Sequence, residues 1–107
     1  MEMNKIQKKV AAKVQEYGAA NGIDIDVPFL VMKLYEEVGE LTNALLIHEG
    51  KARKRKLVSK EESTKMLRGE IADVVGSAIA VADALGIDSE KVLQERWFLN
   101  ERRGNKT

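Results

Sequence analysis

The sequence predicts an all-helical protein, built as a small bundle of four helices. Good helix formers (Ala, Leu, Glu, Lys and Arg) dominate its long stretches, and its 107 residues include a single proline. Apolar residues recur at helical spacing, as at Ile6, Val10 and Val14, whereas the alternation typical of strands is scarce. The length and the 44% of apolar residues suit one core, so we expect a single domain over residues 1–107.

Breakers and capping residues divide the chain into the four expected helices. Their approximate bounds are residues 4–17, 28–48, 60–85 and 89–102. Pro28 suits the first turn of the second helix, where its missing N–H costs no hydrogen bond. Ser59 with Glu62 fits a capping box before the third helix, and Asp88 or Ser89 caps the fourth. The expected stops are the glycines after the first three helices: Gly18, Gly50 and Gly86.

Composition excludes several classes of function. Lys and Arg number 18 against 17 Asp and Glu, so the net charge of +1 creates no global field that favours nucleic acid or an anionic membrane. The chain has no cysteine and a single histidine, His48, so any metal would need oxygen ligands. No apolar run reaches the roughly 20 residues of a transmembrane helix. The segment from Met1 to Lys9 lacks the apolar core of a signal peptide, and we expect a cytoplasmic protein.

The second expected helix carries acids inside its apolar stripe. With residues at intervals of about 100° around the axis and Leu30 at zero, Glu37 falls at about −20° among the leucines of the stripe. Glu40 falls at about −80°, also flanked by apolar side chains. Glu36, at about −120°, lies just outside the stripe.

The third expected helix repeats this arrangement. Glu70 lies in the middle of an apolar stripe that includes Leu67, Val74 and Val81, and Asp73 lies about 60° from Glu70. Each of the two helices therefore places an i, i+3 pair of acids on a face that should be buried.

Buried carboxylates need a counter-charge, because burial penalises the charged form and neighbouring carboxylates repel one another. A divalent cation is the simplest solution, and a set of oxygen ligands favours Mg²⁺, with Mn²⁺ as an alternative. Acid pairs on helices are also common on solvated faces. Lys33, four residues before Glu37, could form an ordinary ion pair with Glu37 or Glu36.

The acids belong to two motifs that resemble those of a known family. Leu34-Tyr-Glu-Glu-Val-Gly-Glu-Leu41 and Gly69-Glu-Ile-Ala-Asp-Val-Val75 are similar to the paired acidic motifs of the MazG-like all-α nucleoside triphosphate pyrophosphohydrolases. The likeness extends over nearly the whole chain. It implies a MazG-type four-helix fold and hydrolysis of deoxy or non-canonical nucleoside triphosphates to the monophosphate and pyrophosphate, a house-cleaning activity on the nucleotide pool.

The resemblance also implies roles for single residues. The metal ligands would be Glu37, Glu40, Glu70 and Asp73, with Glu36 as an auxiliary acid near a metal-bound water. Metal ions would neutralise the triphosphate, polarise the attacked phosphorus and lower the pKa of a bound water.

Other residues are candidates for holding the substrate. Arg96, Asn100 and Arg103 share one face of the fourth expected helix and could grip phosphates, as could Lys33; an exposed polar face is the alternative. Trp97 could stack on the base, although aromatic residues at helical spacing more often belong to a core. His48 lies in register with Leu30 and could line a base pocket, or be a hydrogen-bonded or partly exposed histidine.

The remaining features concern partners. The basic run from Lys51 to Lys56 is interpreted as a solvated connector, because no aromatic residue or nucleic-acid reading motif accompanies it. The long, nearly all-apolar third helix and its many small residues suggest that another chain covers one apolar surface. We therefore expect a homo-oligomer, a dimer or a tetramer, without a membrane partner.

Alternative functions stay open. One is a phosphoribosyl-ATP pyrophosphohydrolase, which has a similar motif set and a different substrate. Another is a non-catalytic helical assembly module whose acids pair across an interface. The third is a nucleic-acid-binding bundle that uses the basic connector.

Overall fold

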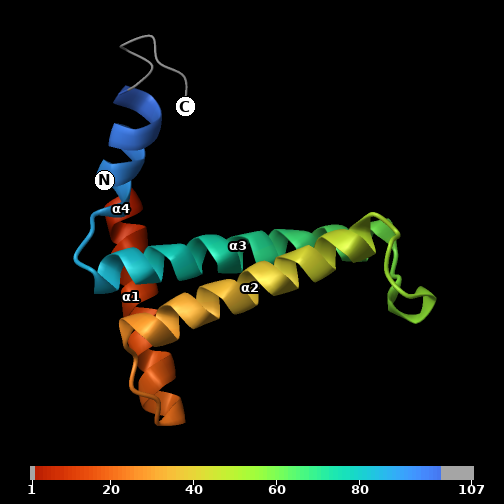
Figure 1. Cartoon of the computed structure of the whole chain (residues 1–107), viewed down its shortest axis with the longest axis horizontal. Helices are drawn as coiled ribbons and strands as arrows, with labels where there is room; N and C mark the ends of the chain where they lie inside the picture. Colours follow the sequence, from red (N-terminus) through yellow and green to blue (C-terminus); the bar gives the residue numbers. More distant parts are fainter. Residues whose placement is uncertain (1, 100–107) are drawn as a thin grey trace. The chain divides into compact units, whose positions relative to one another are not determined.

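The computed structural model describes residues 2–99, and every regular element among them is helical (Figure 1). The elements are α1 (Glu2–Asn21), α2 (Val27–His48), the 3₁₀ turn η1 (Lys54–Lys56), α3 (Lys60–Ala84), α4 (Ser89–Leu93) and the π-helical η2 (Gln94–Phe98). The all-helical class is confirmed. None of the described helices is both long enough and apolar enough to cross a membrane.

The chain divides into two compact units. The first contains α1, the end of α3 from Ile79, α4 and η2. The second contains α2 from Pro28, η1 and α3 as far as Ala78. All five acids of the two motifs belong to the second unit, so the geometry of that unit alone decides whether they meet.

The predicted end of the first helix at Gly18 is wrong, because α1 continues to Asn21. Gly18 is buried inside the helix, and the following segment folds back against it. The N–H of Ile23 donates to the Gly18 carbonyl at 2.9 Å. Gly18 is therefore needed for close packing, and Gly22, at φ +65°, ends the helix.

Replacing Gly18 with alanine should destabilise the protein. A Cβ there would lie 2.8 Å from the Ile23 carbonyl oxygen and 2.6 Å from Ile25 Cγ1, and the backbone atom cannot move cheaply. Overpacking of about 1–3 kcal/mol should outweigh the gain in helix propensity of about 1 kcal/mol. The matched control is Gly39→Ala within α2, where a Cβ meets nothing within 4 Å and stability should rise by up to about 1 kcal/mol. Urea unfolding should show a lower free energy of unfolding for Gly18→Ala and a higher one for Gly39→Ala. Equal changes in the two variants would contradict the packing role of Gly18.

The other predicted helix stops are confirmed. Gly50 follows α2 at φ +71°, and Lys51 N–H donates to the Leu46 carbonyl at 2.8 Å. A hydrogen bond with the same spacing joins the Ile87 N–H to the Ala82 carbonyl at 2.8 Å, beside Gly86. Both are Schellman motifs, which need a residue in the left-handed conformation.

The predicted caps at the starts of α3 and α4 are also confirmed, whereas α1 begins at Glu2, two residues before its predicted start. The hydroxyl of Ser59 accepts from the Glu62 N–H at 3.1 Å at the start of α3. Asp88 accepts from the Lys91 N–H at 3.1 Å at the start of α4. Each cap satisfies a backbone donor that has no partner within the helix.

In the first unit, the Gln7 side chain joins α1 to the end of α3 and to the segment that follows it. Its amide nitrogen donates to the Ile87 carbonyl at 2.9 Å and to Asp83 Oδ1 at 3.3 Å. Its amide oxygen accepts from the Ser89 N–H at 2.9 Å. One glutamine thereby satisfies polar groups on both sides of the turn from α3 to α4.

The fourth helix differs from its prediction as a regular α-helix reaching about residue 102. Its hydrogen bonding changes to the π type over Gln94–Phe98, and its predicted end lies outside the described residues. A π-helical stretch shifts the helical phase of the residues after it. The predicted i, i+4 and i+7 alignment that begins at Arg96 therefore does not follow from α-helical spacing.

Candidate functional site

Acids from α2 and α3 meet within the second unit. Glu37, Glu70 and Asp73 each place a carboxylate oxygen within 4.8 Å of those of the other two. Glu36, Glu37 and Glu40 form a second group with the same spacing. Glu37 belongs to both groups, so it links the acids of α2 to those of α3.

Helical spacing explains how each helix contributes. Residues three apart lie on neighbouring positions of one face, which brings Glu37 beside Glu40 and Glu70 beside Asp73. Farther along the two helices, a hydrogen bond between His48 and Ser63 joins α2 to α3.

The acids are not equally buried. Glu37 and Glu70 are half-buried, as their positions in the middle of the apolar stripes predict. Glu40 and Asp73 are exposed, which corrects the prediction that both lie on buried faces. They occupy the edges of the stripes, and two paired helices cover only the middle of each stripe.

Glu70 provides the clearest sign of an unsatisfied site. Its Oε1 atom is buried and has no hydrogen-bond partner. A buried carboxylate oxygen without a donor is costly. This atom lies in a cluster of carboxylates, where a cation would supply the missing partner.

Burial and mutual repulsion shift the titration of the two central acids. Burial is the main cause that raises the pKa of Glu37, and Glu40, Asp73 and Glu70 raise it further, while Lys33 opposes the shift. The pKa of Glu70 is also raised, first by burial and then by Glu40 and Asp73. Both shifts show that this cluster holds more negative charge than its surroundings favour.

These shifts predict a pH-dependent stability of the metal-free protein. A raised folded-state pKa means that the folded state binds more protons than the unfolded state above the ordinary glutamate pKa of about 4.3. The contribution of Glu37 and Glu70 to the free energy of unfolding should therefore decline as pH rises through their raised values.

The difference between the wild type and Glu70→Gln isolates this effect. Urea unfolding in the presence of a chelator, at pH values from about 4 to 8, should show the variant gaining stability relative to the wild type as pH rises. A difference that is constant with pH, or has the opposite sign, would contradict the raised pKa of Glu70.

Lys33 lies one turn before the acids and forms an ion pair with Glu36, one of the predicted alternatives. Glu36 is exposed, and the Lys33 side chain is partly exposed at 37%. The pair therefore lies at the rim of the cluster. There it can exchange partners at little cost, because exposed ion pairs contribute little to stability.

His48 is hydrogen-bonded, in agreement with the second interpretation of this residue. Its Nδ1 atom lies 2.9 Å from the Ser63 hydroxyl. Ser63 donates to the Lys60 carbonyl at 3.0 Å, so its oxygen can accept from an Nδ1–H. His48 lies eight residues beyond Glu40 on α2, about 12 Å along the helix.

The sequence patterns do not point to Ser63. It is 2% exposed, and its hydroxyl group is the partner that holds His48 in place. The sequence feature that could have identified Ser63 is its position seven residues before Glu70, which places Ser63 and Glu70 on the same face of α3.

The other predicted substrate residues belong to the first unit or lie outside the described residues. Arg96 and Trp97 lie in η2 of the first unit, where Arg96 is exposed and Trp97 is 52% exposed. Asn100 and Arg103 lie outside the described residues. Within the second unit, Lys33 is the predicted phosphate-binding residue nearest in sequence to the acids.

The chemistry of the cluster suits a hard divalent cation. Its donors are all carboxylate oxygens from two helices, and the buried Oε1 of Glu70 needs a partner. Glu37, Glu70 and Asp73 could hold one ion, and Glu40 could extend the donor set through Glu37. Exposed edges at Glu40 and Asp73 leave access for a ligand from solvent.

Comparisons of this chain with protein-family models, curated proteins and solved structures find no match.

Proposed function

We propose that this protein is a Mg²⁺-dependent nucleoside triphosphate pyrophosphohydrolase, with Mn²⁺ as a possible substitute. The observation that carries the proposal is the convergence of Glu37, Glu70 and Asp73 from two helices, with Glu40 adjoining through Glu37. The resemblance of the two acidic motifs to those of MazG-like enzymes supplies the reaction: a nucleoside triphosphate is hydrolysed to the monophosphate and pyrophosphate.

The proposed roles follow from position and burial. Half-buried Glu37 and Glu70 would anchor the metal, and exposed Asp73 and Glu40 would complete its ligands on the open side. Bound Mg²⁺ would offset the charge of the phosphates and activate water. Glu36 could accept a proton at its carboxylate once Lys33 turns from it to a phosphate oxygen.

The experiment that tests the proposal is pyrophosphate release from a panel of ribo-, deoxy- and modified nucleoside triphosphates. The wild type is compared with Glu40→Gln and Asp73→Asn, with and without Mg²⁺. Glu61→Gln is the matched control, because Glu61 is an exposed acid in the first turn of α3. Release that needs Mg²⁺ and is lost in both site variants, but not in the control, supports the proposal.

The panel also includes phosphoribosyl-ATP, because the alternative enzyme class differs in substrate only. A strong preference for that compound would replace the house-cleaning role, which we place in the cytoplasm, with that of a biosynthetic enzyme. No release from any compound, together with no Mg²⁺ or Mn²⁺ binding by calorimetry, would favour the non-catalytic assembly module.

Exposed apolar side chains support the second part of the proposal, a homo-oligomer of MazG-type bundles. In the second unit, Tyr35 is 75% exposed and Val75 is 51% exposed. Tyr35, Val38 and Leu45 of α2 are spaced for one side of a helix, as are Ile71 and Val75 of α3. Such faces are normally covered by another helix. Light scattering at micromolar concentration should give at least the mass of a dimer, and a monomeric mass would refute this part.

A further inference from the structure

The connector between α2 and α3 concentrates positive charge that the proposed reaction does not use. Between residues 49 and 62 there are six cationic side chains and three acids, so the local charge is +3 (six minus three). Five of the cations lie within residues 51–56, and they form what we call the basic tip: Lys51, Arg53, Lys54, Arg55 and Lys56. The tip has most of the local charge in a chain whose net charge is only +1.

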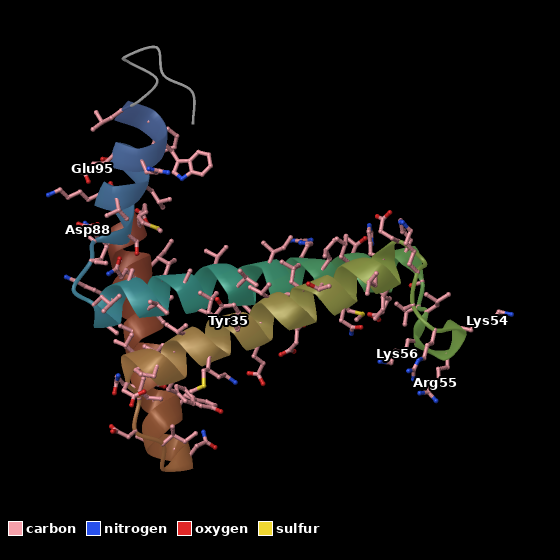
Figure 2. The ribbon with its side chains drawn as sticks, viewed as in Figure 1. Tyr35, Lys54, Arg55, Lys56, Asp88 and Glu95 are labelled. Carbon is pink, nitrogen blue, oxygen red and sulfur yellow. The ribbon has the colours of Figure 1, made fainter. Side chains whose placement is uncertain are left out.

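None of these five side chains forms a hydrogen bond or ion pair with another described residue. All five residues are exposed, and Figure 2 shows Lys54, Arg55 and Lys56 extending from η1 away from α2 and α3. In a 3₁₀ turn, successive side chains point about 120° apart. The cations therefore surround the tip, and they do not form a row along one groove.

The acids of the candidate site do not cancel the positive charge of the tip. Salt screens interactions beyond about 10 Å at ordinary ionic strength. The acid cluster begins at Glu40, about 12 Å along α2 from His48, where the helix ends before the connector. The cluster therefore does not cancel the attraction of the tip for an anionic partner.

Two exposed aliphatic residues follow the cations directly. Leu57 is 39% exposed and Val58 is 45% exposed, and Leu57 has an extended backbone with φ −72° and ψ 139°. No aromatic side chain lies between residues 50 and 60, so the tip has no platform on which a nucleic-acid base could stack. A turn of three residues is also too short to enter a groove of a duplex as a helix does.

In place of the expectations of a solvated connector and of no membrane partner, we propose that the basic tip, with Leu57 and Val58, docks the protein onto the surface of an anionic lipid bilayer. Cations near such a surface are attracted to its lipid headgroups, and each contributes a factor of about five to binding. Leu57 and Val58 would enter the region just below the headgroups, where their apolar surface leaves water. The docking is peripheral, and it does not rest on the proposed enzymatic activity.

The test uses the full chain and sedimentation with vesicles of phosphatidylcholine, with or without one quarter phosphatidylserine. The wild type should bind only the anionic vesicles. Replacing Lys54, Arg55 and Lys56 with alanine should weaken this binding about 100-fold. The matched control replaces Lys5, Lys8 and Lys9, exposed lysines of α1, with alanine; it removes the same charge and should change binding less than about twofold.

A second variant separates a bilayer from other polyanions. Leu57→Asn with Val58→Asn keeps every charge and should weaken vesicle binding roughly tenfold, because apolar surface no longer leaves water. The same variant should leave any weak binding to duplex DNA unchanged. Circular dichroism verifies that each variant is folded.

Three results would overturn the proposal: no binding of the wild type to anionic vesicles, an equal loss in the α1 control, or tighter binding to duplex DNA that is insensitive to Leu57 and Val58. The last would identify nucleic acid as the partner. Glu70→Gln should keep vesicle binding, and the tip variants should keep pyrophosphate release, so this proposal and the enzymatic one can fail separately.

Discussion

Mg²⁺ at one hundred times its dissociation constant should raise the melting temperature of the wild-type protein by roughly 10 to 20 °C. At that concentration, binding to the folded state alone adds about 2.7 kcal/mol to the free energy of unfolding. A domain of this size gains about 4–8 °C for each kcal/mol. The ion would provide a partner for the buried Glu70 Oε1 and relieve the repulsion among Glu37, Glu40 and Asp73.

Glu70→Gln should raise the melting temperature without metal and reduce the stabilisation by Mg²⁺. The metal-free variant should melt above the metal-free wild type at neutral pH, because one buried charge is gone. Its response to Mg²⁺ should fall to about 2–3 °C at the same concentration if affinity drops about 100-fold. Calorimetric melting at a fixed protein concentration measures both, with Glu61→Gln as the control.

The melting temperature of Glu70→Gln without Mg²⁺ distinguishes a metal site from a structural ion pair. If Glu70 served to bind a cationic side chain across an interface, Glu70→Gln would lower the melting temperature without Mg²⁺. Equal Mg²⁺ responses in the wild type and the variant would likewise assign the effect to nonspecific ions. Either result would favour the assembly module.

Glu37→Gln should reduce pyrophosphate release by at least about 100-fold at a fixed Mg²⁺ concentration. Even the outer partners of metal ligands affect affinity or activity by about 10–100-fold, and Glu37 is the residue common to both groups of acids. Glu36→Gln should have a smaller effect, because Glu36 is exposed and paired with Lys33 at the rim.

Initial rates over a range of Mg²⁺ concentrations measure these effects. A partial rescue of Glu37→Gln by high Mg²⁺ is expected, because the lost carboxylate would hold the metal. Circular dichroism verifies that each variant is folded. If Glu36→Gln lost more activity than Glu37→Gln, the assignment of Glu37 as a metal ligand and of Glu36 as an auxiliary acid would be wrong.

Much of the local structure could be predicted from the sequence. Gly50 and Gly86 end helices because a Schellman motif needs positive φ, and Asp88 caps α4 because its side chain accepts from a backbone N–H three residues on. These signals act over a few residues, so they need no knowledge of the fold. Gly18 misled the prediction because its role is close packing against Ile25, a contact with a segment that folds back.

The candidate site was predictable only in part. Helical spacing indicated that Glu37 and Glu70 interrupt apolar stripes, and both are half-buried. The same projection placed Glu40 and Asp73 on buried faces, whereas both are exposed. A projection gives the direction of a side chain from its own helix, but the width of the covered strip depends on the partner helix.

The sequence by itself determined the helical class, most helix ends and the two acid pairs, because these depend on interactions between residues a few positions apart. Only the tertiary structure decided that the acids of α2 and α3 come within 4.8 Å of one another, that Glu70 Oε1 lacks a partner and that His48 pairs with Ser63. Those features depend on the register in which two helices pack. Register is set by the fit of many apolar side chains together, which no single segment of the sequence contains.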